Sequence, residues 1–411
     1  MKKSLFEIYD SGLLKMDIKV VSLKGNEKDL LIGSDLSPFR PSSGGQPSDR
    51  GILFSDGFSA EVEDVYEDEG LIFHKCKKFS GSVKEGQILN AEVDADTRRK
   101  YTIMHSAEHL LFSCLKSVLK EKNLNIDIEK VSIGSEESAF FVNAESLNWN
   151  HIFEAEELAN SIIREARPLR ISYLGTEEAL SDPGLRIKAH RIREDFVRRV
   201  EIEGIDASAC TGTHVKNTSE ILLILVTSLK SLGPSKFEVK FVAGPDTSRK
   251  LFAQSREFRK VASLLGSSDS VFESVLRLWN ENKKLRERHQ QDTLKRIKSL
   301  PGERLFGITF YSETLEDEEQ KVIVKGMSEL CSKQAFALII NRKDERRAVI
   351  YLMRSKELDC DLLEFLNSTV FSMFSGRGGG NSGFVTAELE ISREQEPLLI
   401  EEVRSLILSL K

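Results

Sequence analysis

The feature that most constrains this chain is a pair of histidines, His105 and His109, inside the apolar-periodic run Tyr101–Phe112. Residues four apart on a helix lie on one face, one turn apart. Farther along the chain, Cys210 and His214 repeat this spacing across the sequence Cys-Thr-Gly-Thr-His. Nitrogen and sulfur donors of this mix suit Zn²⁺. Either pair alone arises by chance, but together they predict one metal site shared by two distant segments.

Composition places the chain among globular multidomain proteins. Its 411 residues lead us to expect two or three domains. Hydrophobic residues at 40% are enough for real cores, while charged residues at 30% and a net charge of −6 describe a soluble, mildly acidic protein. This acidity argues against non-specific coating of nucleic acid, although it does not exclude a local basic patch.

Three further features predict a cytoplasmic location. No apolar run approaches the roughly 18 residues of a membrane span, so we expect no membrane association. The N-terminal residues lack a continuous apolar stretch before Glu7 and Asp10, so we expect no signal peptide. The five cysteines are few, odd in number and widely spaced, which argues against a disulfide framework and for a reducing compartment.

Residues 1–95 alternate apolar and polar residues between turn sequences, which predicts short strands in a small β-barrel or sandwich. Within this region Gly44, Gly45 and Gln46 lie between two prolines. Two interpretations of this segment stay open. A stretch rich in turn formers is typical of a solvent loop. Prolines that stiffen the loop, glycines that admit a ligand to the backbone and a glutamine that donates and accepts favour a binding site.

Residues 96–245 predict the metal-bearing domain. Apolar residues at helical spacing indicate helices at Tyr101–Leu119 and Trp149–Ala166. Strand-like stretches lie between and after them, at Ser132–Asn143, Arg170–Tyr173, Val197–Ile202, Ile221–Val226 and Phe237–Ala243. Helices laid on an antiparallel sheet give an α+β layer.

Residues 246–300 predict two charged helices, Asp246–Leu265 and Ser270–Ser299, with a break that begins at Gly266. Their apolar residues fit an antiparallel hairpin or a short coiled coil. Basic residues gather on the second helix: Arg277, Lys283, Lys284, Arg286, Arg288, Lys295, Arg296 and Lys298. Such a run is either an ordinary solvated face or a contact surface for nucleic-acid phosphates.

Residues 301–411 predict a compact α/β domain in which strands and helices alternate. Between a helix and a strand lies the segment Gly376–Gly383, which predicts a glycine-rich turn. Such a turn can cradle phosphate with backbone N–H groups. The segment lacks the Gly-Lys-Ser/Thr of a P-loop, so it does not indicate an NTPase.

These motifs together resemble those of a known family. His105–His109 with Cys210–His214, followed by Val215–Ile221, resembles the editing domain of alanyl-tRNA synthetases and the free-standing AlaX proteins, which deacylate tRNA in trans. Phe39–Gly51 resembles the Gly-Gly-Gln segment of the small β-barrel domain that precedes this editing domain. Glu238–Gly244 resembles the strand that ends it. The motifs occur in the family's order over most of residues 1–245.

The resemblance implies an α+β multidomain chain of the long AlaX form. A small β-barrel would occupy residues 1–95 and the zinc-binding editing domain residues 96–245. A helical hairpin would follow at 246–300, and a C-terminal α/β domain of the DHH-associated type at 301–411. By its element order and Gly376–Gly383, that last domain resembles the C-terminal domain of alanyl-tRNA synthetases.

By this resemblance the C-terminal domain binds the tRNA elbow, forms a homodimer, or does both. Its candidate substrate-contacting residues are Arg377, Gly378, Gly379 and Gly380. Gly44, Gly45 and Gln46 are the corresponding candidates in the first domain. The Asp-His-His unit of DHH phosphoesterases does not occur here, so we expect no such chemistry of this domain.

The implied reaction is hydrolysis of the ester between an amino acid, serine or glycine, and the terminal ribose of tRNA(Ala). The implied zinc ligands are His105, His109, Cys210 and His214. Four protein ligands would close a tetrahedral site, as in structural zinc. Either one of the four therefore lies outside the inner set, with His214 the weakest, or the ion becomes five-coordinate during turnover.

Three other residues are candidates for the chemistry, and three positions depart from the family. Glu108 is a candidate base, and Gln46 and Thr213 are candidate pocket residues. Glu108 lies where a hydroxyl or apolar residue is frequent, Thr211 where glycine is usual, and Arg40 where an aromatic is common. The departures at Glu108 and Thr211, which lie close in sequence to the ligands, bear on amino-acid selectivity more than on metal binding.

Two rival functions stay open. His105, Glu108 and His109 match the inverted zincin pattern His-x-x-Glu-His, which predicts a metalloprotease but leaves Cys210 and His214 without a role. A closed four-ligand zinc site would instead indicate a tRNA-binding protein without catalysis. A complete alanyl-tRNA synthetase is not expected, because the predicted barrel leaves no room before it for an aminoacylation domain.

Overall fold

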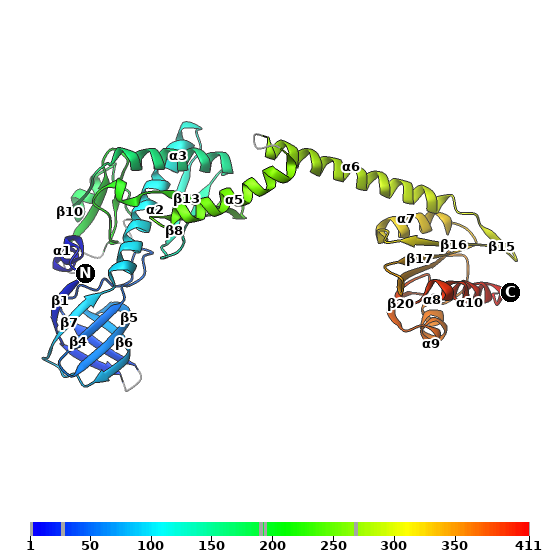
Figure 1. Ribbon diagram of the computed structural model, residues 1–411, viewed down its shortest axis with the longest axis horizontal. Helices are drawn as coiled ribbons and strands as arrows, with labels where there is room; N and C mark the ends of the chain where they lie inside the picture. Colours follow the sequence, from blue (N-terminus) through cyan, green and yellow to red (C-terminus); the bar gives the residue numbers. More distant parts are fainter. Residues whose placement is uncertain (1–2, 26–28, 189–191, 193–194, 267–269, 411) are drawn as a thin grey trace. The chain divides into compact units, whose positions relative to one another are not determined.

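The chain divides into two units, Met1–Arg259 and Lys260–Lys411, which are described separately. The computed structural model describes residues 3–25, 29–188, 192, 195–266 and 270–410 (Figure 1). Among the helices in these ranges, none is both long and apolar enough to cross a membrane.

Seven antiparallel strands and one helix form the first part of unit 1. The helix is α1 (Lys3–Ser11), and the strands are β1 (Lys15–Lys19), β2 (Ser22–Gly25), β3 (Leu30–Ser34), β4 (Gly51–Ser55), β5 (Phe58–Asp68), β6 (Leu71–Gly81) and β7 (Ile88–Val93). Their order in the sheet is β1-β7-β4-β5-β6-β3-β2. Within the described residues the edge strands β1 and β2 do not pair with each other, so the predicted closed barrel is not confirmed.

The helix α1 is absent from the sequence-based prediction. Its apolar residues Leu5, Phe6 and Tyr9 are buried in the same core as the inward residues of the sheet. A helix of nine residues shows too few turns for its periodicity to stand out from a strand pattern. Burial against the sheet, not intrinsic propensity, explains why this segment is helical.

Two helices on an antiparallel sheet form the second part of unit 1, which confirms the predicted α+β layer. The helices are α2 (Ala95–Glu121) and α3 (Trp149–Glu165), and the sheet order is β13-β14-β9-β8. These strands span β8 (Ile126–Ser132), β9 (Ser138–Ala144), β13 (Ile224–Gly233) and β14 (Lys236–Ala243). Asp94 caps α2 by accepting a hydrogen bond from the Thr97 N–H.

A separate three-stranded antiparallel sheet leads into the second ligand pair. Its strands are β10 (Leu169–Gly175), β11 (Phe196–Ile202) and β12 (Asp206–Ala209), in that order, with the short helix α4 (Thr176–Ser181) after β10. The segments predicted at 170–173 and 197–202 are therefore strands, but they belong to their own sheet. Cys210 follows β12 directly, so this sheet sets where the turn Cys210–His214 begins. This turn, which holds the second ligand pair, is called the ligand turn below.

Two long helices, α5 (Thr247–Leu265) and α6 (Val271–Lys298), follow unit 1's last strand. They agree with the two predicted charged helices and with the break that begins at Gly266. The other two residues of the predicted break lie outside the described residues. The boundary between the units falls within α5. The predicted hairpin packing of the two helices stays a prediction.

A six-stranded sheet is the centre of unit 2, in the order β15-β16-β17-β18-β20-β19. The strands are β15 (Glu303–Leu305), β16 (Ile308–Glu316), β17 (Ala335–Arg342), β18 (Arg347–Arg354), β19 (Gly376–Asn381) and β20 (Phe384–Glu390). Only β16 and β17 pair in parallel. Helices include α7 (Gln320–Leu330), α8 (Leu362–Phe365), α9 (Phe371–Met373) and α10 (Glu396–Leu408).

The prediction of a glycine-rich turn in unit 2 is wrong in its local structure. Residues 376–381 form β19, an edge strand paired with β20, and only the residues before Phe384 turn. A Cβ on Gly376 or Gly378 would lie 2.4 or 2.3 Å from a carbonyl oxygen of β20. The glycines therefore permit a close strand pairing, and backbone groups that were expected to face phosphate are partly used by the ladder.

A buried histidine links the first sheet to the loop that follows β3. His74 lies on β6 with no exposed surface, and its Nδ1 donates to the Ile32 carbonyl at 2.9 Å. Its Nε2 lies 2.7 Å from the Ser37 hydroxyl, which in turn accepts the Phe39 N–H. A neutral imidazole fits this arrangement, with Nε2 accepting from the Ser37 hydroxyl, and burial lowers the pKa of His74 to about 4 against the opposing effect of the Ile32 hydrogen bond.

We expect His74 to make unit 1 less stable in acid. Above pH 6.5 the imidazole is neutral in both states, but as the pH falls toward 4 only the unfolded chain takes up the proton. Between pH 7.5 and 5 this should cost about 2 kcal/mol of unfolding free energy. Denaturant unfolding monitored by Trp149, in a Trp279→Phe background, measures it.

The matched variants are His74→Gln, which should lose this part of the pH dependence, and His289→Gln, which alters an exposed histidine of unit 2 and should keep it. Equal pH dependence in all three proteins would contradict the assignment to His74.

Candidate metal centre

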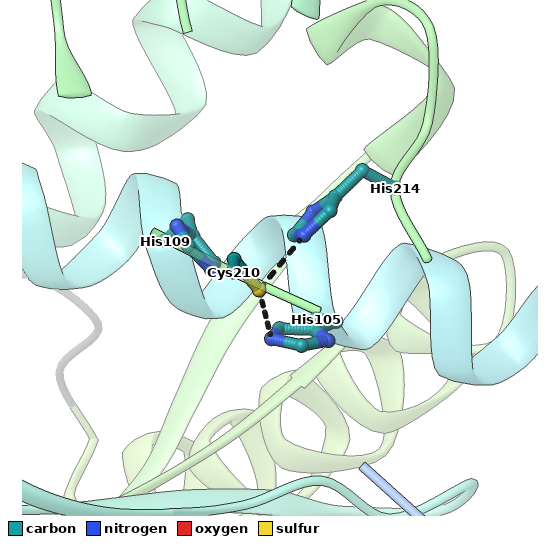
Figure 2. A group of neighbouring side chains, drawn as sticks. All are labelled: His105, His109, Cys210 and His214. Carbon is teal, nitrogen blue, oxygen red and sulfur yellow. Dashed lines mark hydrogen bonds between the residues drawn. The ribbon is translucent and has the colours of Figure 1, made fainter. Parts of the chain in front are cut away.

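The structure brings the four predicted metal ligands together. His105 and His109 lie on α2, with ring centroids 5.2 Å apart, and the His214 ring lies 4.7 and 4.8 Å from them. Cys210 Sγ is 3.4 Å from His105 Nε2 and 3.3 Å from His214 Nε2 (Figure 2). One donor atom from each residue can be chosen so that all four lie within 4.8 Å of one another. This donor set fits a zinc ion.

A glycine allows the ligand turn to reach the helix. A Cβ on Gly212 would lie 2.0 Å from the His105 ring and 2.9 Å from the side-chain oxygen of Gln46. No side chain fits there without displacing a ligand. The glycine between Cys210 and His214 is therefore a packing requirement of the site.

The Gly-Gly-Gln loop contacts the cluster directly, which favours the binding-site interpretation of that segment. Gln46 is 2% exposed, and its Oε1 accepts from His105 Nδ1 at 2.8 Å and from the Thr213 N–H at 3.1 Å. Its Nε2 donates to the Thr213 hydroxyl at 3.0 Å, which also lies 2.8 Å from the Thr102 hydroxyl. Because Nδ1 of His105 is used, Nε2 is left to face Cys210.

The two glycines of this loop have a conformational role. Gly44 and Gly45 have φ of 60° and 85°, in the left-handed region. A Cβ on Gly45 would lie 2.5 Å from the Val131 carbonyl oxygen, so the turn packs against β8 at close range. The hydroxyl of Ser43, the residue before them, lies 2.6 Å from the hydroxyl of Thr211.

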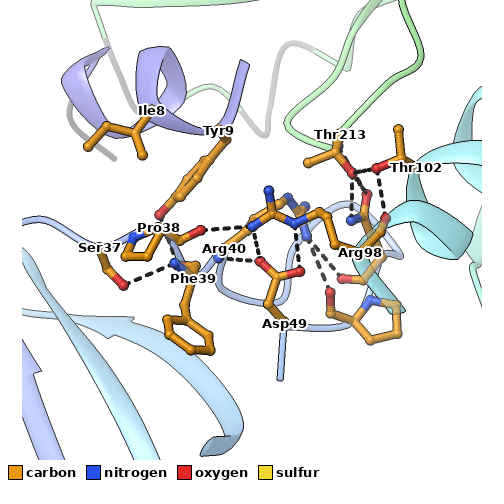
Figure 3. A network of polar contacts seen from close by, with 12 residues as sticks. Ile8, Tyr9, Ser37, Pro38, Phe39, Arg40, Asp49, Arg98, Thr102 and Thr213 are labelled. Carbon is orange, nitrogen blue, oxygen red and sulfur yellow. Dashed lines mark hydrogen bonds and ion pairs between the residues drawn. The ribbon is translucent and has the colours of Figure 1, made fainter. Parts of the chain in front are cut away.

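A buried charge network fixes the base of the loop (Figure 3). Asp49 accepts from the Arg40 N–H at 2.6 Å and from Arg98 Nε of α2 at 2.8 Å. The Arg40 guanidinium donates to the carbonyls of Thr211 at 3.1 Å and Ser43 at 2.9 Å. Burial lowers the pKa of Arg40 to about 10, against the opposing effect of Asp49, so it stays charged at neutral pH. Arg40, one of the departures from the family pattern, therefore ties this loop to the ligand turn.

Two partners of His109 went unnoticed in the sequence. Asp206 Oδ2 lies 3.1 Å and Ser208 Oγ 2.9 Å from His109 Nδ1, and Arg186 donates to Asp206 at 3.0 Å. Asp206 and Ser208 alternate along β12, so they share one face of the strand that leads into Cys210. This alternation is the sequence pattern that could have indicated two polar side chains next to the metal ligands. A carboxylate behind a ligating imidazole fixes its orientation.

The charges of the cluster favour the metal-binding protonation states of Cys210 and His214, whereas His109 must give up a proton to bind a metal. Burial alone would raise the pKa of Cys210, but His105, His214 and His109 hold it well below its usual range. Burial lowers the pKa of His214 to about 3. Burial also disfavours a charged His109, yet Cys210 and Asp206 raise its pKa to about 10. Thiolate and neutral imidazole are the forms that bind zinc, and a cation would replace the His109 proton.

Glu108 lies beside the donor set, where the helix geometry placed it. Its side chain is 2% exposed, and Oε2 is 3.8 Å from His109 Nε2. Oε1 is buried and has no hydrogen-bond partner among the described residues. Such an orphaned acceptor calls for a ligand or water that would satisfy it.

The candidates in unit 2 belong to a different part of the chain. Arg377 is exposed, with a guanidinium nitrogen 3.7 Å from a carboxylate oxygen of Glu388 on β20. Gly378, Gly379 and Gly380 lie in the edge strand β19. Their role in tRNA binding stays a prediction.

Comparisons with known proteins agree with the motifs. A family model described as tRNA synthetases class II (A) matches residues 6–97. A second, described as threonyl and alanyl tRNA synthetase second additional domain, matches residues 197–236. The alanyl-tRNA editing protein AlaX-L of Pyrococcus horikoshii is 26% identical over 417 residues, which cover 96% of this chain and 97% of that protein.

The alanine–tRNA ligase of Thermotoga petrophila is 26% identical over 356 residues, which cover 85% of this chain and 41% of that protein. The chain thus spans less than half the length of this ligase. Among solved structures, the C-Ala domain of Aquifex aeolicus alanyl-tRNA synthetase covers 26% of this chain at 17% identity, with a TM-score of 0.24. The predicted resemblance to AlaX proteins and to the matching part of alanyl-tRNA synthetases is confirmed.

We expect Gly212→Ala to abolish stable metal binding, because the added Cβ takes the place of the His105 ring. Zinc content per chain after dialysis, measured by plasma mass spectrometry, should fall at least about tenfold, as for loss of a ligand or its support. Gly175→Ala, which adds a Cβ in open space of the same unit, is the control. Full zinc in the Gly212→Ala protein would contradict the packing argument.

We expect Asp206→Asn to weaken zinc binding about 10- to 100-fold while the fold is kept, because the charge behind His109 is lost and the shape is not. Competition with a chromophoric chelator measures the affinity. Asp182→Asn, in which the altered carboxylate lies near Arg199 instead, should bind zinc as the wild type does. Equal zinc affinities for both variants would show that Asp206 does not support zinc binding.

Proposed function

We propose that this chain, a relative of the AlaX editing proteins, hydrolyses the ester of mischarged tRNA(Ala) and releases serine or glycine. The observation that carries the proposal is the pairing of a four-donor cluster with the Gly-Gly-Gln loop through His105 and Gln46. The name and full-length coverage of the AlaX-L relative support the same substrate class. The partner is aminoacylated tRNA(Ala), and the compartment is the cytoplasm.

His105, His109, Cys210 and His214 are the residues that would hold Zn²⁺. When bound, zinc supplies a Lewis acid that polarises an ester carbonyl or lowers the pKa of water. The chain's own residues do the rest. Gln46 and Thr213 keep the His105 ring oriented, and Asp206 does the same for His109.

Glu108 is the proposed base. Its unpartnered Oε1 is free to accept the proton of the attacking water. The water oxygen bonds to the ester carbon, the bond from that carbon to the ribose oxygen breaks, and the proton passes from Glu108 to the ribose oxygen. The products are the free amino acid and tRNA with an intact terminal ribose.

Selectivity against alanine has a physical basis in the polar groups around the cluster. A site that hydrogen-bonds a substrate hydroxyl can reject the analogue without it by about 10⁴-fold or more. The hydroxyls of Thr102 and Thr213 and the amide of Gln46 form a connected polar group beside the metal ligands. They are the proposed readers of the serine hydroxyl.

The non-enzymatic alternative rests on the same geometry. Four donors within 4.8 Å could close a tetrahedral structural site and leave a tRNA-binding protein. The orphaned carboxylate oxygen of Glu108 favours the enzyme, because a structural site has no use for a buried, unpartnered acceptor. The metalloprotease interpretation is disfavoured, since Cys210 and His214 complete the donor set without a downstream carboxylate.

Two proposals concern the C-terminal domain. By analogy with the domain that it resembles, unit 2 would contact the tRNA elbow or hold two copies together. Arg377–Gly380 on the edge strand β19 and the basic residues of α6 are the proposed contacts.

The decisive assay is deacylation of seryl-, glycyl- and alanyl-tRNA(Ala), with zinc content measured on the same sample. Serine should leave at least about 10²-fold faster than alanine, because the proposed polar group hydrogen-bonds the serine hydroxyl; the rate for glycine shows whether a smaller side chain is also released. Glu108→Gln should keep zinc and lose about 10²- to 10⁴-fold in rate. Cys210→Ala should lose zinc and activity together, and Cys360→Ala, in unit 2, should lose neither. A zinc-loaded wild type that releases no amino acid supports the binding protein.

A further inference from the structure

A polar pocket of about 440 Å³ opens in unit 1 next to the Gly-Gly-Gln loop. Its wall combines residues of that loop with residues of the first sheet and of α2. They include Pro47, Ser48 and Arg50 from the loop side, Asp64 and Lys75 from β5 and β6, and Tyr101 from α2. None of these residues is a proposed metal ligand, and none is among the ligand contacts described above.

Two cations of this pocket make no direct polar contact with a described residue, although both lie near enough to Glu63 to stabilise its charge. Neither the Arg50 nor the Lys75 side chain makes a hydrogen bond or ion pair with any residue that the structure describes. By contrast, a carboxylate oxygen of Glu63 at the same pocket lies 2.7 Å from Lys77 Nζ. Beyond the Glu63–Lys77 pair, the pocket sets the charges of Arg50 and Lys75 against the one carboxylate of Asp64, so its net charge is positive, and an anionic group such as phosphate would satisfy it.

The pocket also offers groups for a hydroxyl. Asp64 uses Oδ1 to accept from the Ser48 hydroxyl at 2.6 Å and from the Val65 N–H at 2.9 Å. Its Oδ2 has no hydrogen bond to a described residue. The side chain of Tyr101 is 8% exposed, and within the described residues its hydroxyl is unpaired as well. A ligand with both a phosphate and a sugar hydroxyl matches this combination.

The pocket and the metal centre are neighbours through two shared elements. Pro47 and Ser48 directly follow Gln46, whose side chain holds His105. Tyr101 precedes His105 by one turn of α2, so their Cα atoms lie about 6 Å apart along the helix. The pocket residue and the metal ligand are therefore about one helical turn apart along α2.

We propose that this pocket binds the nucleotide that precedes the terminal adenosine of the tRNA, with its phosphate on Arg50 and Lys75 and its 2′-hydroxyl on Asp64. The inference rests on the proposed function, which places the terminal ribose at the metal centre. Phosphate contacts would position the strand, and the 2′-hydroxyl contact would select RNA over DNA. The volume suits a single nucleotide rather than a duplex.

The test compares two substrates. One is the aminoacyl-tRNA(Ala) that the wild type deacylates, and the other is the 3′-aminoacyl ester of adenosine alone, which cannot reach the pocket. For the double variant Arg50→Ala/Lys75→Ala we expect kcat/KM to fall about tenfold or more on the tRNA and to stay unchanged on the adenosine ester. Lys19→Ala, an exposed lysine of β1, should change neither.

Two further measurements sharpen the test. Removing the 2′-hydroxyl of the penultimate nucleotide should lower kcat/KM of the wild type and leave Asp64→Asn less affected. In filter binding of uncharged tRNA(Ala), the double variant should reduce the slope of log affinity against log salt by about 1 to 2, as expected for two lost phosphate contacts.

Each outcome supports or overturns the proposal. A double variant as active on the tRNA as the wild type, or one that loses activity equally on both substrates, overturns the pocket assignment while the deacylase stands. If the zinc-loaded wild type deacylates neither substrate, the proposed function fails, and the salt slope still decides whether Arg50 and Lys75 contact RNA. An unchanged slope would then overturn the pocket as well.

Discussion

The hydrogen bond from His105 to the side chain of Gln46 joins the two parts of unit 1 at the metal centre. His105 comes from α2, whereas Gln46 comes from a loop of the first sheet, and the same amide oxygen accepts the backbone N–H of Thr213 in the ligand turn. One buried amide therefore sets the orientation of three segments. His109 and Glu108 lie on the same helix as His105, and Cys210 and His214 lie in the same turn as Thr213, so they share the segments that this junction joins.

The loop that carries Gln46 is held in place by a network of buried charges. Arg40, Asp49 and Arg98 are all buried, and they connect the loop to α2 and to the carbonyl of Thr211. Removing one member of such a set leaves an uncompensated buried charge, which typically costs about 3–5 kcal/mol. This network ties the loop to α2 and to the ligand turn, so a region with the composition of a solvent loop is a buried part of the site.

Local patterns in the sequence were sufficient for part of this structure. The four-residue spacing of the ligands, the long helices and the α+β layer follow from periodicities within single segments. A binding site at the Gly-Gly-Gln segment was only one of two open interpretations, because the contact of Gln46 with His105 depends on how the first sheet packs against α2. The contacts of Asp206 with His109 and of Arg40 with the ligand turn join segments far apart in the chain. No local pattern in the sequence could therefore predict these contacts. The edge strand β19 was taken for a turn, since glycine content alone cannot distinguish a turn from closely paired strands.

The central claim is that one thiolate and the imidazoles of α2 and the ligand turn share a single zinc ion. X-ray absorption at the zinc edge of the purified, zinc-loaded protein tests it most directly. The account predicts one sulfur scatterer at about 2.3 Å with the remaining ligands nitrogen or oxygen at about 2.0–2.1 Å. A spectrum without sulfur, or with only oxygen ligands, would contradict it.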